Sequence, residues 1–568
     1  MKNTLLHKWL ISFLILSPVI AKGQDVDHID WKNPVKLSGS INLQLQSYSA
    51  VGIPDRQQPF TWLINGNPTL TILNVQLPFS FLISNFDNKY YQPFNQFGVS
   101  PYYKWIKLHL GYRSVQFSPF TLGGYRMLGA GVELTPGHLR FGFMYGRLNR
   151  STQVDTAQNA NPLAYRPPPT YTRLAYAVKI GVGTDKNYFD ISFLKGWDKE
   201  TSLNGDVRDS VPVQENKVIG FSWMTTIKKK IVWKTDIGLS IYDQDIHSTT
   251  FTDSSNSLLS SGFIKNFIQP TAATQYLIAG ETRLGYHDNM YGADLVYRRV
   301  DPDYKSMGAY FFQTDIEQYS IAPYLRLGNG KYSFNGNIGT QHDNLYGLKA
   351  TTSRNFIGSF NLNLMPSTKF GLNINYSNYG ITQNPTRISP NDSSLFKQIS
   401  SNYTFVPFLN FINDNYADNI QLVACFQQLN APTAGLNTSP NQNTTVGSLI
   451  YSHSWLKKNI TGNLSFNYNS TNLTGQGTIG SYGGGAGISF VAFKNKTNFS
   501  ISSNYCTNFL NGSSNGYTTT GNLSCTIPIY KKHSVQLTGS YMNNNSKDET
   551  VVQTFSEYIF RIVYGLTF

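Results

Sequence analysis

Apolar and polar residues alternate with a period of two along most of the chain. In residues 35–46, VKLSGSINLQLQ, valine, leucine, glycine and isoleucine occupy the odd positions, and lysine, serine, asparagine and glutamine occupy the even ones. The same alternation returns in residues 331–342, 368–379 and 459–470. Because successive side chains of a β-strand point to opposite faces, each stretch predicts a strand with one apolar and one polar face.

Short and long connections between these stretches take turns. The short ones lie near residues 136–137, 184–186, 228–230, 328–330 and 365–367. The long ones lie near residues 50–66, 149–170, 198–215, 244–274, 301–315, 380–400 and 430–443. This rhythm predicts an antiparallel up-and-down sheet of about 24 strands, within a range of about 22–26, with both termini on the short-turn side.

One connection breaks the rhythm. Residues 85–101, NFDNKYYQPFNQFGVSP, are long and aromatic where a short turn is expected. They either cap or enter the mouth of a barrel, or they form an irregular loop, and both interpretations stay open.

The first residues have the layout of a secretory signal peptide. Two lysines flank the start of an apolar run over residues 9–20, and small residues precede Gln24. The run is too short to span a bilayer and is followed by a cleavage site. We therefore predict that residues 1–23 are removed by cleavage between Gly23 and Gln24.

The composition favours a membrane β-barrel over a soluble domain. Aromatic residues make up 14% of the chain and charged residues another 14%, whereas ordinary soluble domains have roughly 25% charged residues. The mean hydropathy is only −0.28, as expected when lipid-facing and lumen-facing residues alternate. Since hydrocarbon offers the backbone no hydrogen bonds, such a sheet has to close.

We therefore predict an all-β protein, a single transmembrane antiparallel barrel in the bacterial outer membrane. Residues 24–34 would be a short periplasmic segment and residues 35–568 the barrel, with short periplasmic turns and long extracellular loops. Outer-membrane lipid and the barrel-assembly machinery are the expected partners. The net charge of +14 is spread over lysine-rich turns, so no nucleic-acid partner is expected, and the 3 cysteines are too few for a disulfide framework.

The end of the sequence, FSEYIFRIVYGLTF, predicts the strand that closes the barrel against the first one. Its aromatic and aliphatic residues fall on every second position and would face lipid. Its last outward residues, Tyr564, Leu566 and Phe568, resemble the C-terminal signal that the assembly machinery recognises in bacterial outer-membrane barrels.

Residues 92–148 resemble a segment of large outer-membrane β-barrel proteins of the Bacteroidota. The likeness rests on GYR at 111–113, FSPFTLGG at 117–124, GAGVEL at 129–134 and the PG, RF and MYGR elements of residues 136–147. The function of that family is poorly defined, so the resemblance implies location and fold only. TonB-dependent transporters carry a plug domain before the barrel, and residues 24–34 are too short to supply one.

Charged residues are concentrated on the inward positions of the first half of the predicted barrel. We call this set the charged arc: Lys107, Arg113, Glu133, Arg140, Arg173, Lys179, Asp190, Lys234, Asp236, Glu281, Arg283, Asp294, Arg298 and Arg326. From about residue 331 onwards the inward positions are mostly neutral. The arc either binds a plug, a threaded segment or a charged solute, or it only crosslinks adjacent strands in a wet lumen.

A second feature is an inward glycine stripe, Gly483, Gly485 and Gly487, in the sequence SYGGGAGISF. Glycine permits a sharp bend of the sheet or the close approach of another backbone. Either a strained corner or a packed loop or partner explains it.

Chemistry beyond transport has little support in the sequence. His109 faces inward alone, and His453 faces outward near the periplasmic end of its strand. No cluster of His, Cys and carboxylates has metal-ligand spacing, so neither an enzyme nor a cofactor is expected.

A barrel of this width needs something to fill it, because barrels of about 22 strands already hold a plug. The leading hypothesis is a porin-like or gated conduit for solutes, closed by its own loops, with residues 244–274 and 380–400 as candidates. One alternative is a translocation or assembly component whose lumen holds a partner protein. Another is a surface adhesion or scaffold barrel, in which only the loops matter.

Overall fold

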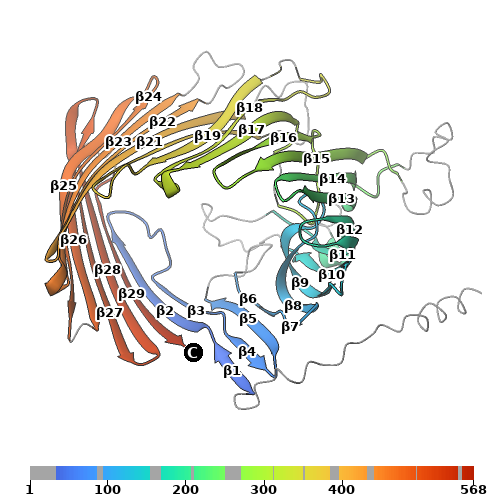
Figure 1. The fold of residues 1–568 in the computed structure, drawn as a ribbon, viewed down its shortest axis with the longest axis horizontal. Coiled ribbons are helices and arrows are strands. Elements are labelled where there is room, and N and C mark those ends of the chain that lie inside the picture. Colours follow the sequence, from blue (N-terminus) through green and yellow to red (C-terminus); the bar gives the residue numbers. More distant parts are fainter. Residues whose placement is uncertain are drawn as a thin grey trace, which may run out of the picture.

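The computed structural model is a ring of antiparallel strands (Figure 1). It describes residues 34–85, 94–153, 168–205, 210–249, 270–310, 313–349, 352, 354–383, 396–430, 441–493, 496–547 and 553–568. The predicted signal peptide and most of the segment 24–34 lie outside these residues. None of the helices in the described part of the chain has the length and hydropathy of a membrane-spanning segment.

The strands and short 3₁₀ turns follow one another in chain order. They are β1 (Val35–Ser38), β2 (Ser40–Val51), β3 (Phe60–Gly66), β4 (Thr69–Ile72), β5 (Val75–Ser84), β6 (Gln96–Val99), β7 (Tyr102–Tyr103), β8 (Ile106–Gln116), β9 (Gly123–Leu134), β10 (Leu139–Asn149), β11 (Thr172–Gly183), β12 (Tyr188–Lys199), η2 (Glu200–Ser202), β13 (Glu215–Ile227), β14 (Ile231–Asp243), β15 (Thr274–His287), β16 (Tyr291–Val300), β17 (Ile316–Leu327), η3 (Gly328–Gly330), β18 (Tyr332–His342), β19 (Arg354–Leu364), β20 (Phe370–Gln383), β21 (Phe396–Ile412), β22 (Tyr416–Asn430), β23 (Gln442–Trp455), η4 (Leu456–Lys458), β24 (Ile460–Leu473), β25 (Gly477–Ala492), β26 (Thr497–Leu510), β27 (Ser513–Tyr530), β28 (His533–Ser546) and β29 (Phe555–Thr567).

Three strands of the barrel are interrupted and carry two labels each. Gly39, with a positive φ of 108°, separates β1 from β2. Residues 67–68 separate β3 from β4, and residues 100–101 separate β6 from β7. Within the described residues, the 29 segments of the sheet thus make 29 − 3 = 26 barrel strands. The predicted all-β closed barrel is confirmed, at the upper end of the predicted strand number.

The barrel closes between its first and last strands. β2 pairs antiparallel with β29 from Ser40 opposite Thr567 to Val51 opposite Ser556, and Figure 1 shows the blue β2 beside the red β29. The ladder continues to the end of the chain, because the Phe568 N–H donates to the Gly39 carbonyl at 3.0 Å. The prediction that the C-terminal strand closes the sheet is therefore confirmed.

Two predicted connections proved wrong. The long connection predicted at 50–66 contains β3, and the aromatic segment 85–101 contains β6 and ends at the start of β7. The cause is a tight turn at Leu73 and Asn74, whose positive φ angles of 46° and 73° no glycine signals in the sequence. With this turn and a second at residues 104–105, the connection after β5 moves to the long-loop side and the alternation is restored.

The long-loop side is not uniform. β24 and β25 are joined by residues 474–476, and β26 and β27 by residues 511–512, although both connections lie on that side. The strict alternation of short and long connections therefore fails in the last third of the barrel, where tight turns occur at both ends.

The outer face is lined with exposed aromatic and aliphatic side chains. One row of stacked rings crosses four strands: Phe334, Phe360, Tyr376 and Tyr403 follow one another with centroid separations of 6.3, 5.6 and 4.9 Å. Such cross-strand aromatic pairs stabilise a sheet and offer lipid an apolar surface.

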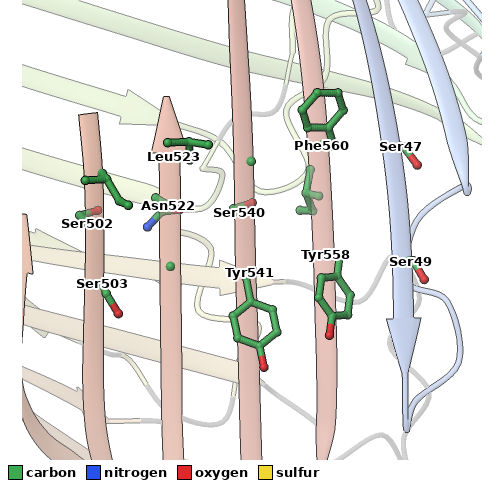
Figure 2. Close-up of a pocket in the computed structure, with 14 residues that line it drawn as sticks. Ser47, Ser49, Ser502, Ser503, Asn522, Leu523, Ser540, Tyr541, Tyr558 and Phe560 are labelled. Atoms are coloured by element: carbon green, nitrogen blue, oxygen red, sulfur yellow. The ribbon is translucent and has the colours of Figure 1, made fainter. Parts of the chain in front are cut away.

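The closing seam carries a shallow apolar depression on this outer face, of about 480 Å³. Its floor is formed by the small residues Gly521 and Gly539, and the rings of Tyr541 and Tyr558 stand beside it with centroids 5.1 Å apart. Figure 2 shows these two tyrosines next to each other on adjacent strands, with Phe560 above them.

A hydrophobic core lies on the opposite, inner face, but on one side of the ring only. It consists of inward residues of β8–β17 together with residues from two connections, 117–122 and 301–315. These two connections fold back into the barrel and cover its inner wall.

Candidate functional site

The first inward connection, FSPFTL at residues 117–122, packs into hollows that glycines leave in the wall. A Cβ atom on Gly142 would lie 2.6 Å from a ring carbon of Phe117. A Cβ atom on Gly238 would lie 2.6 Å from the Cβ atom of Phe120. Phe120 and Leu122 are buried with 2% and 0% of their surface exposed, so the wall and the connection fit without space for water.

The second inward connection uses the same kind of recess. Met307 lies against Gly196, where an added Cβ atom would come within 2.9 Å of the Met307 sulfur. Tyr304 and Met307 are both buried. The glycines of β10, β12 and β14 therefore act as sockets for side chains that come from loops.

The two connections are bonded to each other. The Tyr304 hydroxyl donates to the Phe120 carbonyl at 2.7 Å, and the Ser306 hydroxyl donates to the Thr121 carbonyl at 2.6 Å. The Gly123 N–H also donates to the Gly308 carbonyl at 2.9 Å. We call residues 117–122 and 304–308 the loop pair, because these bonds make them one body.

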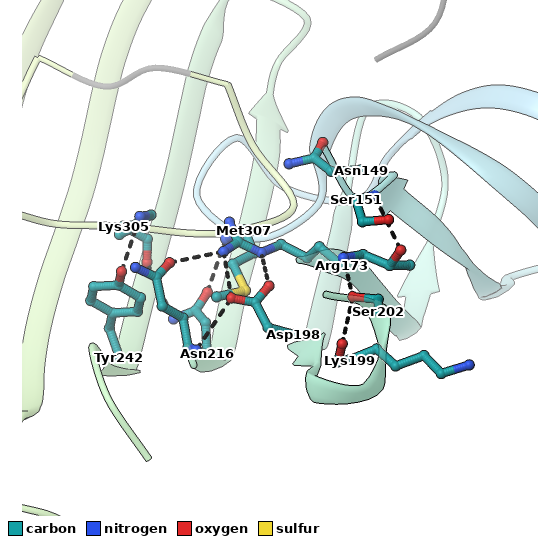
Figure 3. A network of polar contacts seen from close by, with 12 residues as sticks. Asn149, Ser151, Arg173, Asp198, Lys199, Ser202, Asn216, Tyr242, Lys305 and Met307 are labelled. Atoms are coloured by element: carbon teal, nitrogen blue, oxygen red, sulfur yellow. Dashed lines mark hydrogen bonds and ion pairs between the residues drawn. The ribbon is translucent and has the colours of Figure 1, made fainter. Parts of the chain in front are cut away.

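Asn216 of β13 holds the loop pair to the wall. Its carboxamide oxygen accepts from the Met307 N–H at 2.9 Å, and its Nδ2 donates to Ser240 Oγ at 2.8 Å. Ser240 Oγ in turn donates to the Lys305 carbonyl at 2.6 Å. Asn216 is fully buried, and Figure 3 shows it between the wall and the strand-like loop that carries Lys305 and Met307. A buried carboxamide with partners on both sides fixes the loop in one register.

A second contact joins the first connection to the wall. Thr121 Oγ1 and Ser192 Oγ lie 3.0 Å apart, and both residues are buried. Thus each half of the loop pair has its own polar anchor on a strand.

Lys305 brings a charge into this contact. Its ammonium group donates to the Tyr242 hydroxyl at 3.0 Å. Burial, assisted by repulsion from the Arg173 guanidinium and opposed by attraction to Asp198, lowers the pKa of Lys305 to about 8. The loop pair therefore carries, at its contact with Tyr242 of the wall, a group that changes charge only slightly above neutral pH.

The far end of the second connection is tied to the next loop. Asp315, with 2% of its surface exposed, accepts from the backbone N–H groups of Asn344 and Leu345 at 3.0 and 2.9 Å. It also forms an ion pair with Lys349. Residues 301–315 are thereby held at both ends, by the wall and by the loop between β18 and β19.

Most of the charged arc forms cross-strand ion pairs beside or below the loop pair. Arg173 Nε lies 2.8 Å from Asp198, and Figure 3 shows this pair next to Asn216. Arg140 Nε lies 2.8 Å from Asp190 and reaches it across Gly181 of the strand between them. Other contacts of the arc, some within one strand, include Glu133 with His109 at 2.8 Å and Lys107 at 3.5 Å, Asp236 with Ser222 at 2.5 Å and Lys234 at 3.4 Å, Glu281 with Arg283 at 3.4 Å and Arg298 at 3.9 Å, and Asp294 with Arg283 at 3.6 Å.

Three members of the arc interact otherwise. Lys179 lies over the ring of Phe117 at 5.2 Å and so touches the loop pair. Arg326 lies over Tyr324 at 6.0 Å, and Arg113 donates to Ser80 Oγ at 2.7 Å. Most of the arc thus crosslinks strands, and Lys179 also touches the loop pair. That the arc binds a plug, a threaded segment or a charged solute stays a prediction.

The glycine stripe of β25 is covered by side chains of neighbouring strands. A Cβ atom on Gly485 would collide with the Asn504 side chain, and one on Gly487 would collide with Asn463. Gly483 lies opposite Cys506, with the Tyr505 carbonyl beside it. Among the described contacts, inward carboxamides therefore occupy the space that the glycines leave.

The C-terminal residues of the predicted assembly signal lie along the closing seam. Leu566 is opposite Ile41, and the Tyr564 hydroxyl lies 2.5 Å from His533 Nδ1. Their recognition by assembly machinery stays a prediction.

Two other loops were predicted from the sequence to close the lumen. Most of residues 244–274 and 380–400 lie outside the described residues. The two connections that do fold inward were missed, although the sequence held a signal. FSPFTL and the YKSMGAY segment from residue 304 are unusually apolar for loops that meet water.

No family model matches the sequence, and no curated protein matches it. Among solved structures, the chain is similar to the copper transporter OprC, with 8% identity, a TM-score of 0.41, and 94% of this chain and 80% of that chain covered. It is similar to the P pilus usher (PapC) translocation pore, with 11% identity, a TM-score of 0.38, and 94% and 99% covered. It is also similar to BauA, the ferric preacinetobactin receptor from Acinetobacter baumannii, with 9% identity, a TM-score of 0.37, and 94% and 81% covered. These neighbours are outer-membrane β-barrels, and at such TM-scores the likeness carries no argument about the function of this chain.

Proposed function

We propose that the protein is a conduit for solutes across the bacterial outer membrane and that the loop pair closes part of its lumen. The observation that carries this proposal is the docking of residues 117–122 and 304–308 on the inner wall through buried, non-covalent contacts. Because these contacts are non-covalent and separate from the backbone ladder of the wall, their release would leave the barrel folded. The proposal includes no catalytic step.

The size of the barrel supports a closing element. Barrel diameter grows with strand number, and barrels of about 22 strands hold a plug. A wider lumen without a filling would pass small solutes indiscriminately. We propose that the loop pair, docked in the glycine recesses of the wall, supplies part of this filling from within the same chain.

Locking the loop pair to the wall tests this function. In the double variant T121C/S192C, made with Cys425, Cys506 and Cys525 replaced by serine, the new thiols stand where oxygens now lie 3.0 Å apart. That separation suits a disulfide after small adjustments. In a planar bilayer we expect the oxidised form to stay at one low conductance and the reduced form to show additional larger openings.

The single variant S192C, in the same serine background, is the control and should ignore oxidant. Identical large openings in the oxidised and reduced double variant would show that the loop pair does not gate the lumen. Complete absence of current in both states would contradict the conduit itself.

A further inference from the structure

One pair of neighbouring strands in the barrel wall is joined by only a short ladder of backbone pairs. β6 and β7 meet β8 through four residue pairs: Gly98 with Gly111, Val99 with Leu110, Tyr102 with Lys107, and Tyr103 with Ile106. Beyond Gly111, β8 continues to Gln116 and pairs with β9 on its other side. Among the described residues no ladder joins β6 to β8 above that point, so the two strands separate towards the long-loop side.

A cavity of about 650 Å³ fills this separation and reaches both faces of the wall. Ser80 and His109 line it from the inner face. Phe81, Phe97 and Tyr112 line it from the outer face, where Phe97 is 63% exposed and its ring meets Tyr112 edge-on at 6.4 Å. The opening therefore connects a polar interior with a surface that meets lipid.

Cationic groups surround this opening. Arg113 donates to Ser80 Oγ at 2.7 Å and to the Pro78 carbonyl at 3.2 Å, both neutral acceptors. Arg126 donates to the carboxamide of Gln96, and Lys107, which is ion-paired with Glu133 at 3.5 Å, also lines the cavity. In the described part of the chain no carboxylate forms an ion pair with Arg113. Arg113 lies at the inner side of the opening, beside Ser80, and a guanidinium that lines a cavity and donates to neutral acceptors there favours an anionic ligand.

The height of these groups fits the outer leaflet. Arg113 lies three residues before the strand end at Gln116, or about 10 Å from it at ~3.4 Å per residue. Below it, on the outer face and towards the short turns, Leu110 and Leu108 are exposed by 45% and 40%. A headgroup at the cations would thus continue into an apolar track for an acyl chain.

We propose that this opening between β6 and β8 binds an anionic, phosphate-bearing lipid of the outer leaflet. The phosphate interacts with Arg113 and Arg126 at the opening, and the acyl chain runs along Phe97 and Leu110 on the outer face. This binding site is separate from the loop pair and does not depend on the conduit function.

Lipid retention by the purified full-length protein tests the site. The protein is placed in nanodiscs of phosphatidylglycerol or of phosphatidylcholine, extracted into detergent, and weighed with its bound lipid by native mass spectrometry. We expect retained phosphatidylglycerol on the wild-type protein and a reduction of about tenfold in R113Q and R126Q, because charge-assisted hydrogen bonds are lost.

R561Q is a matched control, because Arg561 also donates to a glutamine oxygen, that of Gln46 at 2.9 Å, away from this opening. Heat-modifiable migration in SDS gels verifies folding, and R126Q remains informative if R113Q does not fold. The single-channel current should be the same in all three variants. Equal retention of the two lipids, or equal retention in wild type and R126Q, would overturn the proposal, and displacement by millimolar inorganic phosphate would reassign the site to a free anion.

Discussion

At the scale of single residues, the docking of the loop pair rests on Asn216 and Lys305. Asn216 satisfies polar groups on both sides of a dry contact, which makes its partners costly to leave unpaired, by about 1–3 kcal/mol each. Lys305 instead weakens docking when it is protonated, because its charged ammonium group is buried in the docked state. One residue therefore strengthens docking at every pH, while the other makes docking depend on pH.

The pKa of Lys305 sets the direction of that dependence. The docked state has a pKa of about 8, below the ordinary 10.5 that the released loop regains. Between these two values the released state binds more protons, so docking strengthens as pH rises from about 8 to 10.5 and is weakest below 8. We expect longer closed intervals in single-channel records at pH 10 than at pH 7.5.

The groups that face Lys305 are Tyr242, Arg173 and Asp198. K305M removes the titrating group and keeps a side chain of similar length. Its closed intervals should change little over the same pH range, and an unchanged pH response in K305M would assign the effect to another group.

At the scale of elements, period-two alternation predicted most strands, including β2, β18, β20, β24 and β29, since each has one face in lipid. It missed β3 and β6 because tight turns without glycine separate them from their neighbours and Pro68 interrupts β3–β4. The charged arc was found from the same alternation. The loop pair was not predicted, because the period-two pattern of strands carries no information about where a connecting loop folds.

The socket glycines offer an element-scale test. In G238A the added Cβ atom would press on Phe120 and Tyr304, so the loop pair should leave the wall while the barrel persists. We expect protease added from the loop side to cleave near residues 304–308 at least ten times faster than in wild type, on the order of a 1.4 kcal/mol loss of docking.

G447A is the matched control, because the nearest atom to a Cβ atom there is 4.0 Å away. Its cleavage pattern should equal that of wild type. If residues 304–308 of G238A stayed protected from the protease, the wall would have shifted to accommodate the added Cβ atom and the loop pair would have stayed docked.

At the scale of the whole molecule, the sheet closes into a barrel through one long ladder between its first and last strands. β2 and β29 pair along all of β2, so a defect in β29 leaves two sheet edges exposed to lipid, which hydrocarbon does not tolerate. The even number of strands, 26, also brings both ends of the described chain to the short-turn side.

Proline at Ile562, in the middle of β29, removes a backbone donor from this ladder and should prevent stable closure. We expect I562P to lose heat-modifiable migration in SDS gels and to accumulate in the insoluble fraction. T567P, at the strand end, should fold normally. Normal migration of I562P would show that closure tolerates a break at its centre.

The position of the loop pair divides the circumference into unequal parts. Its sockets, anchors and ion pairs lie on β8–β17, while the wall from β18 to β28 contributes inward carboxamides and hydroxyls. Under the proposed function, a hairpin inserted or removed in that second part would change the bore without touching the loop pair. Chimaeras that exchange only the second part should then differ in the largest solute admitted and keep the same response to pH.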